Sequence, residues 1–358
     1  MNIVRAIINL KALKYNLSVL QKTAPKSKIL AVIKANAYGH GMLKVAQTLG
    51  NVYALGVARI GEATYLRDKG ITKDIVLLEG FFSSLDLPLL VDYNLQTVIH
   101  CVEQVDVLLN TSLKKPLKIW LKLDIGMHRL GFHPDEFNAV LKTLITCPNV
   151  EKPINIVSHF DCADELENPK TEQQIRLFKK YISEDIGLAS LANSAGVLAW
   201  PEAHHDIIRP GISLYGVSPF VDKTVKVPQL KPVMTLKSKL IAVRQHLKGE
   251  TVGYGANWMA GSDTTVGVVA MGYGDGYPRM APQDTPILIN SRIVPIIGRV
   301  SMDMLTVDLG LNCTDKVGDD VILWGDGLLV NDVAKHIGTI GYELITKLTS
   351  RVDLHYRD

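Results

Sequence analysis

A lysine stands at the end of a strongly apolar run in the segment KILAVIKANAYGHG (28–41). Five of the first seven residues are apolar, which predicts a strand that is buried on both faces. Lys34 ends this strand, and a loop of small residues that contains Tyr38 follows it. An amine in this position can form an imine with a carbonyl compound. The structural alternative is a lysine whose stem packs on the protein and whose ammonium group reaches water.

Other candidate strands also end in residues that could bind or react. These residues are Arg129 after 117–123, Ser158 and His159 at the end of 154–159, Asn193 and Ser194 after 188–193, and Arg209 and Gly211 after 205–209. Guanidinium groups suit carboxylates and phosphates, and small residues let backbone amides approach an anion. Each residue alone has a structural explanation, but together they predict one site. The set contains no pair of carboxylates, which argues against glycosidase chemistry.

These residues share a site only if the strands that carry them are neighbours in one sheet. Strands and helices alternate over about the first two hundred residues, which is typical of α/β folds. The predicted strands are 28–34, 53–58, 74–79, 96–100, 117–123, 154–159, 188–193 and 205–209. Eight parallel strands predict a closed (β/α)8 TIM-like barrel rather than an open sheet, with its chemistry at the carboxyl ends of the strands. The element boundaries in the stretch 80–100 are poorly marked, which leaves room for one strand more or fewer.

The pattern changes after about residue 228. Short β-type runs separated by Gly, Asp, Asn and Pro replace the alternation, and they predict a mostly β domain over 229–358 after a barrel domain over 1–228. A short alternating strand at the start of the chain is a candidate for pairing with this second domain. Asn9, which follows that strand, is expected to cap a helix with Leu10, Leu13, Leu17 and Leu20 on one stripe.

Composition excludes several classes of function. The net charge of +3 gives no basic surface for nucleic acid or membrane. The start of the chain lacks the pattern of a signal peptide, and four scattered cysteines indicate reduced thiols in the cytoplasm. His204 and His205 are adjacent, a poor spacing for a metal site. GYGDG (272–276) precedes Tyr-Pro rather than a helix, which argues against a dinucleotide loop.

Nine blocks, in order along almost the whole chain, resemble the alanine racemases, pyridoxal-phosphate-dependent enzymes of fold-type III. They are KANAYGHG (34–41), LDIGMHRLGF (123–132), VSHF (157–160), NSAG (193–196), IIRPGISLYG (207–216), VGYG (252–255), MGYGDGYPR (271–279), GRVSMDM (298–304) and GYELITKLTSRV (341–352). The C-terminal blocks separate the chain from single-domain proteins of the same barrel class. Ser301 stands where the family often has cysteine, and serine also occurs there.

The resemblance implies that Lys34 holds pyridoxal 5'-phosphate as an imine. The other residues that it places around the cofactor are Tyr38, His159, Asn193, Ser194, Arg209, Gly211, Ile212 and Tyr342. It implies that Arg209 faces the pyridine nitrogen, and that Arg129 and the backbone of Met302 bind the substrate carboxylate. The residues implied to support the site or line its entrance are Lys122, which is often carbamylated in the family, Tyr273, Arg279 and Asp303.

Racemisation needs a proton removed from one face of the α-carbon and another returned to the opposite face. The resemblance implies that Lys34 and Tyr254 are the two bases for the interconversion of L-alanine and D-alanine. A tyrosine has a pKa of about 10 in model peptides, so nearby positive charge is needed for it to act near neutrality. We infer that a guanidinium at the pyridine nitrogen disfavours a second positive charge there. The ring is then a weaker electron sink, which favours racemisation over transamination.

Tyr254 lies in the second domain, which in this family meets the partner subunit's barrel. The resemblance therefore implies a head-to-tail homodimer with shared sites, in the cytoplasm of a bacterium. The enzyme would supply D-alanine for peptidoglycan or act in alanine catabolism. The alternatives are a racemase acting on serine, lysine or arginine, a non-catalytic cofactor carrier or regulator, and a decarboxylase of related architecture. Tyr254 and Arg129 argue against the carrier, and no cysteine-containing block typical of the decarboxylases stands out.

Overall fold

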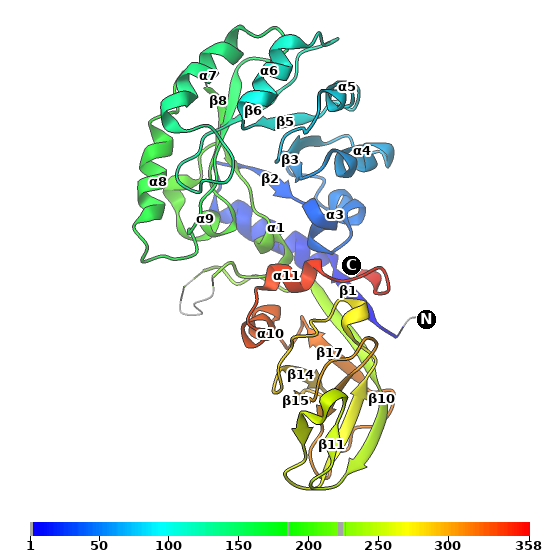
Figure 1. Cartoon of the computed structure of the whole chain (residues 1–358). Helices are drawn as coiled ribbons and strands as arrows, with labels where there is room; N and C mark the ends of the chain where they lie inside the picture. Colours follow the sequence, from blue (N-terminus) through cyan, green and yellow to red (C-terminus); the bar gives the residue numbers. More distant parts are fainter. Residues whose placement is uncertain (1–2, 185, 221–224, 226) are drawn as a thin grey trace.

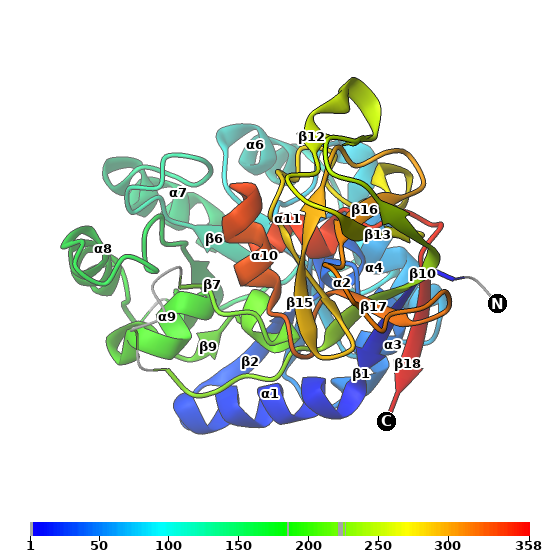
Figure 2. The ribbon, with the colours of Figure 1, turned by 90° about the horizontal axis from the view of Figure 1, so that it is seen from below.

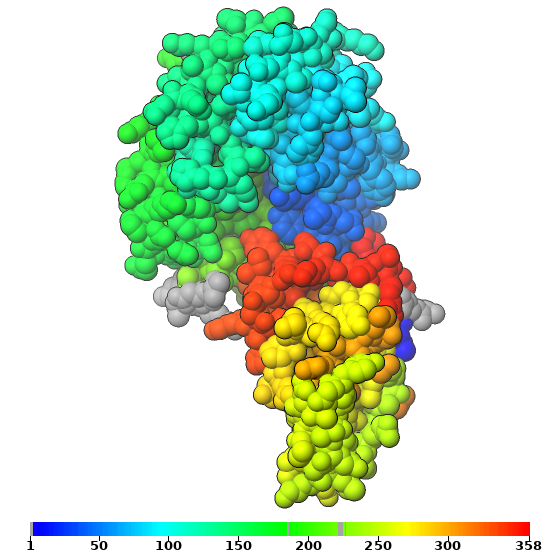
Figure 3. Space-filling view, in the orientation of Figure 1, coloured from blue at the N-terminus to red at the C-terminus, as the bar shows by residue number. Residues whose placement is uncertain are grey.

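The chain folds into a barrel and a second, mostly β part that projects from one end of it (Figure 1). The computed structural model describes residues 3–184, 186–220, 225 and 227–358. The space-filling view shows the second part as a narrow extension of the wider barrel (Figure 3). No helix among these described residues is long and apolar enough to cross a membrane.

The barrel is closed by eight parallel strands in sequence order, as predicted. They are β2 (Lys28–Val32), β3 (Ala54–Val57), β4 (Asp74–Leu77), β5 (Gln96–Ile99), β6 (Ile119–Lys122), β7 (Ile154–Val157), β8 (Ile186–Ser190) and β9 (Ile207–Ile208). β9 pairs with β2 and closes the ring. Most strands are shorter than predicted, because the polar residues at their carboxyl ends already belong to the loops. Because eight strands close the barrel, the alternative of one strand more or fewer is wrong.

The barrel strands are apolar on both faces because one face packs inside the barrel and the other against the surrounding helices. Leu30, Val76, Val98 and Trp120 belong to a cluster of buried side chains contributed by seven of the eight strands. A much larger cluster contains the other buried residues of the strands together with those of the surrounding helices. Continuous burial explains why the strand sequences do not alternate between apolar and polar residues.

Helices cover the outside of the barrel. They are α1 (Leu10–Thr23), α3 (Met42–Thr48), α4 (Ile60–Asp68), α5 (Leu87–Asp92), α6 (Val102–Asn110), α7 (Pro134–Thr146), α8 (Lys170–Lys179) and α9 (Ser194–Ala199). Asn9 caps α1 as predicted, because its side chain accepts a hydrogen bond of 2.9 Å from the Ala12 N–H. All four leucines of the predicted α1 stripe are buried.

The second part is a strongly bent sheet in the order β13-β16-β15-β14-β17-β10-β1-β18, in which β13 also pairs with β10. Its strands are β1 (Arg5–Asn9), β10 (Met234–His246), β13 (Thr264–Val269), β14 (Pro286–Ile289), β15 (Arg292–Ile297), β16 (Leu305–Asp308), β17 (Asp320–Trp324) and β18 (Asp353–Arg357). β1 lies between β10 and β18, so both ends of the chain join this sheet. A small hairpin of β11 (Thr251–Val252) and β12 (Trp258–Met259) lies at the outer end (Figure 1).

Two short helices lie between the sheet and the barrel. They are α10 (Val330–Ile337) and α11 (Gly341–Thr346), and the view from below shows them across the end of the barrel (Figure 2). α11 packs against α2 (Lys34–Tyr38), the helical turn that follows β2. The second part therefore contributes residues directly to the barrel mouth.

Candidate active site

The segment after β2 is a left-handed helical turn, where the sequence predicts a loop. Ala35, Asn36, Ala37 and Tyr38 have φ angles of 53°, 53°, 54° and 52°. Left-handed backbone costs about 1–2 kcal/mol for each residue with a Cβ atom, so four such residues in succession need support from outside the turn. Lys34 begins this turn and Tyr38 ends it, so its shape fixes where both side chains start.

Side chains within the segment hold the far end of the turn. The Asn36 side-chain oxygen accepts a hydrogen bond of 2.9 Å from the Met42 N–H. The Nδ1 of His40 lies 3.0 Å from the Ala37 carbonyl oxygen and 2.8 Å from the Tyr38 carbonyl oxygen. Burial lowers the pKa of His40 to about 4, so the ring is neutral at pH 7. Its proton must lie on Nδ1, because both of these partners are acceptors.

Two glutamates from the neighbouring βα units contact Lys34 and the residue after it. Glu79, just after β4, places Oε1 3.9 Å from the Lys34 Nζ and Oε2 3.0 Å from an Arg59 nitrogen. Glu62, near the start of α4, accepts a hydrogen bond of 2.7 Å from the Ala35 N–H. The sequence prediction missed both glutamates. Glu79 ends a predicted strand, a position that could have identified it.

Tyr38, Tyr215 and Tyr342 form an aromatic group beside the turn. The Tyr38 ring stacks on Tyr215 at a centroid distance of 4.9 Å, and Tyr342 from α11 lies 6.1 Å from Tyr38. Gly39, at φ +80°, allows this approach, because a Cβ atom there would lie 2.0 Å from the Ile345 carbonyl oxygen of α11. Burial raises the pKa of Tyr38 to about 12 and also raises the pKa of Tyr342. Both hydroxyl groups therefore keep their protons as donors at neutral pH.

Arg209 lies just after β9 and is only 6% exposed. Its guanidinium donates to the Ser190 hydroxyl at 2.7 Å and to the carbonyl oxygens of Ser158 and Leu191, and it lies 3.4 Å from the His159 Nδ1. Burial lowers the pKa of Arg209 to about 10, so it remains protonated at pH 7. Burial and the Arg209 charge lower the pKa of His159 well below its usual value. His159 is therefore a neutral ring beside a fixed cation.

Lys122, the last residue of β6, and Arg129, in the loop after it, add two further positive groups. Burial, followed by the charges of Arg209 and Arg129, lowers the pKa of Lys122 to about 8. The Arg129 side chain lies in an exposed loop, yet its charge still reaches Lys122 and His159. Lys122, Arg129 and Arg209 are thus three cationic groups near one another at the barrel mouth, which suits anionic ligands, while Glu79 faces Lys34.

Hydroxyl groups and backbone amides converge between the ends of β8 and β9. The buried Ser194 hydroxyl accepts hydrogen bonds from the Gly211 N–H at 3.0 Å and the Ser213 N–H at 3.2 Å. Ile212 is buried between these two amides, and Asn193 caps α9 by accepting from the Gly196 N–H. A Cβ atom on Gly211 would lie 2.5 Å from the Tyr38 hydroxyl oxygen, so glycine is needed for this close approach.

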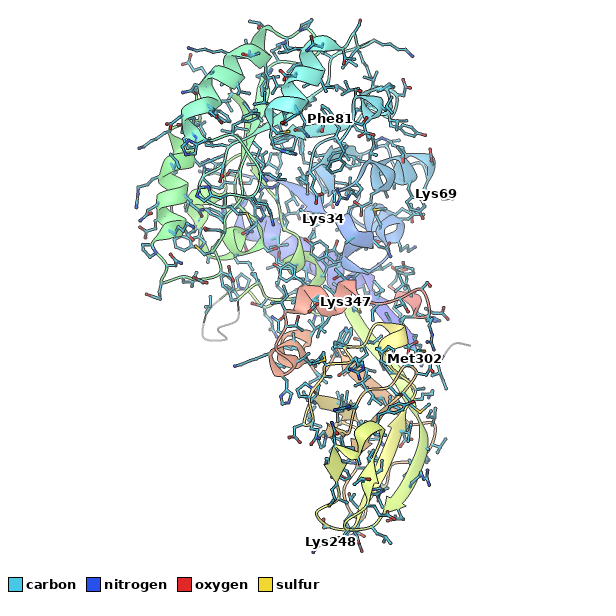
Figure 4. All side chains as sticks on the ribbon, viewed as in Figure 1. Lys34, Lys69, Phe81, Lys248, Met302 and Lys347 are labelled. Carbon is cyan, nitrogen blue, oxygen red and sulfur yellow. The ribbon has the colours of Figure 1, made fainter. Side chains whose placement is uncertain are left out.

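A second group of predicted site residues lies on the projecting part. Tyr254, Tyr273 and Met302 are 72%, 39% and 53% exposed. Arg279 and Asp303 are also exposed. Figure 4 places Met302 on the projecting part and Lys34 in the barrel, and Figure 1 shows β11, which precedes Tyr254, near the far tip. Within one chain the structure therefore separates the predicted second base from Lys34.

Arg351 ties together two loops of this second group, and the sequence prediction missed it. Its guanidinium lies 3.2 Å from the Asp275 carboxylate and 2.9 Å from that of Asp303. The backbones of the same loops also join, because the Gly274 N–H donates to the Met302 carbonyl at 2.8 Å. Among the described residues, no cluster of three His, Cys, Asp or Glu side chains could hold a metal ion.

Comparison with known proteins gives a consistent result along the whole chain. Residues 8–219 match the family model described as "Alanine racemase, N-terminal domain", and residues 233–356 match "Alanine racemase, C-terminal domain". The chain is 58% identical to an alanine racemase of Aeromonas hydrophila over 351 residues, and 57% identical to one of Vibrio vulnificus over 353 residues. The first match covers 98% of both chains and the second 99% of both.

Solved structures agree with these matches. The crystal structure of the biosynthetic alanine racemase from Pseudomonas aeruginosa has a TM-score of 0.96 and 44% identity, with 100% of both chains covered. The structure of alanine racemase from Acinetobacter baumannii has a TM-score of 0.91 and 39% identity, again with 100% of both chains covered.

Proposed function

The chain belongs to the alanine racemase family, whose members are pyridoxal-phosphate-dependent isomerases, and we propose that it interconverts L-alanine and D-alanine with Lys34 and Tyr254 as its two bases. The observation that carries this proposal is the match of both domains over nearly the full length. The barrel mouth supports it, because Lys34 lies there among groups that suit an anionic cofactor and an amino-acid substrate.

The residues of the barrel mouth fit pyridoxal 5'-phosphate. Its phosphate needs several hydrogen-bond donors, and the protonated hydroxyls of Tyr38 and Tyr342 can supply two of them. The absence of a side chain at Gly211 keeps space beside the Tyr38 hydroxyl, where a Cβ atom would otherwise stand. Ser194 and the buried backbone at Ile212 complete this end of the site. Lys34 would attach the cofactor as an imine, and Arg209 would face its pyridine nitrogen.

Bound cofactor supplies an electron sink that stabilises negative charge on the substrate α-carbon. Lys34 Nζ and Tyr254 Oη then act on opposite faces of the α-carbon, so that one removes a proton and the other returns one. Arg209 supplies a fixed positive charge, because its pKa of about 10 keeps it protonated. His159 adds no charge at neutral pH, because its pKa is lowered well below the ordinary value. We propose that Arg209 supplies the positive charge that assists Tyr254 and that the neutral His159 does not.

Substrate binding is assigned to Arg129 and the backbone N–H of Met302. A guanidinium matches the planar carboxylate of an amino acid, and Lys122 lies close enough to Arg129 for their charges to interact. We assign Lys122 as the carbamylated lysine of the family. A carbamate there would turn a repulsive neighbour of Arg129 into an attractive one. Tyr273, Tyr342, Arg279 and Asp303 would line the entrance.

A head-to-tail homodimer would bring the two groups of site residues together. The exposed side chains of Tyr254, Tyr273 and Met302 are available to a second copy of the chain. In such a dimer each barrel mouth would receive Tyr254 of the partner subunit, and each dimer would hold two composite sites.

The experiment that tests this function follows α-hydrogen exchange and chirality together in deuterated water. The wild-type protein should introduce deuterium while inverting either enantiomer of alanine. Tyr254→Phe should abolish inversion but retain exchange on one enantiomer, because the base on the other face remains. Borohydride reduction of the loaded enzyme should place the pyridoxyl group on Lys34. Inversion by Tyr254→Phe at the wild-type rate, or labelling of another lysine, would overturn the assignment.

A further inference from the structure

We propose that Glu62 is a positioning residue for Lys34, which it serves by holding the first peptide of the left-handed turn. This inference rests on the proposed role of Lys34 as the cofactor-binding lysine and base. Glu62 belongs to the β3–α4 unit, so it would act on Lys34 from the neighbouring βα unit of the barrel.

The Glu62 carboxylate joins two loops through three backbone N–H groups. Its Oε1 accepts from the Ala35 N–H at 2.7 Å, and its Oε2 accepts from Ala58 at 2.8 Å and from Arg59 at 3.1 Å. Ala35 directly follows Lys34, and Ala58 directly follows β3. Because β3 is paired with β2 inside the barrel, the second oxygen anchors the carboxylate to a rigid strand end. The first oxygen then fixes the peptide that joins Lys34 to the turn.

This peptide needs an external acceptor. The four residues from Ala35 to Tyr38 all have positive φ angles near 53°, which is unfavourable for residues with a Cβ atom. Asn36 and His40 hold the later part of the turn, whereas the hydrogen bond from Ala35 lies at its beginning. A charged acceptor binds an amide N–H more strongly than a neutral one. Glu62 therefore holds the beginning of the turn, next to Lys34, where the backbone sets the direction of the Lys34 side chain.

A purely local role for Glu62 is the alternative explanation. It also accepts from the Arg59 N–H, the position before α4, so it could simply cap its own helix. Asp86 gives a matched comparison in the next βα unit. Its carboxylate accepts from the Phe82 N–H at 3.0 Å and the Ser83 N–H at 3.2 Å, within its own loop. If local capping were the only role of Glu62, removing the charge of Glu62 or of Asp86 should therefore change activity equally.

The test compares Glu62→Gln with Asp86→Asn and with the double variant Glu62→Gln/Ala35→Gly. A glutamine has one acceptor oxygen, and its NH2 group would face an N–H donor of the other loop. Either the bond to Ala35 or its anchor at Ala58 and Arg59 is lost, so Glu62→Gln should loosen the Ala35 peptide in both cases. Glycine adopts positive φ without the cost of a Cβ atom, and Ala35 is exposed, so its removal leaves no cavity. If Glu62 holds a strained peptide, the glycine should recover function that the glutamine variant has lost.

Three measurements report the result: kcat/KM, the amide hydrogen exchange of residues 34–42, and the fraction of Lys34 trapped by borohydride at limiting cofactor. We expect Glu62→Gln to lower kcat/KM about tenfold or more, as removal of a charge-assisted hydrogen bond does. It should also speed exchange in 34–42 and lower the trapped fraction. Asp86→Asn should stay within about twofold of wild type, and Ala35→Gly should restore most of the loss.

Unchanged exchange in 34–42 for Glu62→Gln would overturn the proposal. So would an equal loss of activity in Asp86→Asn, or a double variant with no recovery. The exchange measurement does not depend on which lysine reacts. If borohydride labels another lysine, the proposed function of Lys34 fails, while faster exchange at Ala35 still shows that Glu62 holds the turn.

Discussion

Arg209 is a buried cation, and the groups that its guanidinium contacts are all neutral. The groups that its guanidinium contacts are a hydroxyl, a neutral imidazole and two carbonyl oxygens. These partners satisfy its N–H groups but carry no negative charge, so its positive potential extends into the barrel mouth. The same contacts hold the group rigidly. Both properties suit a residue that must oppose protonation of a neighbouring heterocycle.

Reversal of this charge should change the reaction that the enzyme catalyses. We expect Arg209→Glu to slow racemisation by about a hundredfold or more and to increase transamination, measured as pyruvate formed per alanine inverted. A carboxylate at this position favours a protonated ring nitrogen and thus a stronger electron sink. Arg209→Lys, which keeps the charge, is the control. An unchanged ratio of pyruvate to inverted alanine in Arg209→Glu would contradict this role.

Lys122 is expected to react reversibly with carbon dioxide. Its pKa of about 8 means that the neutral, nucleophilic amine is scarce below pH 7 and increases as the pH rises through 8. Carbamate formation should follow the same direction. Native mass spectrometry should detect one added CO2 at pH 8 in bicarbonate, and acid treatment should remove it. Lys122→Ala should lack the added mass. An adduct that persists in this variant would place the modification elsewhere.

The residues that sequence could identify are those that strand ends and family blocks mark. Arg209 stands directly after β9, and Lys34 stands two residues after β2, at the carboxyl ends of barrel strands where chemistry is expected. Glu62 could not be identified in this way, because it lies inside a helix and its effect depends on a contact 27 positions away in the chain. Such a contact becomes visible only when the pairing of β2 with β3 brings the two loops together.

Arg351 joins its own segment to two loops of the projecting part. It comes from the segment between α11 and β18, and it pairs with Asp275 in the Tyr273 loop and with Asp303 in the Met302 loop. The Thr349 N–H donates to the Asp275 carbonyl at 3.1 Å and strengthens the same junction. Residues assigned to the entrance and to substrate binding therefore share one support.

Removal of this support should affect substrate binding more than the chemical step. We expect Arg351→Gln to raise the KM for alanine about threefold to tenfold with a smaller change in kcat, because uniform binding is lost. Arg292→Gln is a matched control: Arg292 pairs with Asp315 in the same domain, and both arginines are half-exposed and face a buried aspartate. The control should lower thermal stability similarly but leave KM unchanged. A KM increase of the same size in both variants would indicate a general structural effect.

The elements themselves were predicted better than their local conformation. All eight barrel strands were found in the sequence, because burial on both faces leaves continuous apolar runs between turn residues. The left-handed turn at 35–38 was not, because alanine-rich sequence carries no signal for positive φ. Its conformation comes from hydrogen bonds with Glu62, His40 and Met42, and these need the folded barrel.

One chain holds the two proposed bases in different places. Lys34 lies in the barrel mouth, whereas Tyr254 follows β11 near the tip of the projecting part (Figures 1 and 4). If the dimer is head-to-tail, every active site takes one base from each subunit. No single chain could then catalyse racemisation.

A mixture of two inactive variants should therefore recover activity. Lys34→Ala and Tyr254→Phe homodimers should each be inactive, but a mixed dimer has one barrel with intact Lys34 that faces an intact Tyr254 of the other chain. Random exchange of subunits makes about half of the dimers mixed, with one working site of two, so about a quarter of wild-type activity should return. A failure to recover activity, with mixed dimers verified by mass spectrometry, would contradict the shared site.

The position of β1 has a consequence for how this protein is made. β1 is made before the other strands, yet it pairs with β10 and with β18, which come much later in the sequence. A nascent chain can therefore close its barrel before β10 and β18, the two neighbours of β1, have been made. We expect ribosomes stalled before β18 to display a protease-resistant barrel while the amides of Arg5–Asn9 next to that missing strand remain open to solvent.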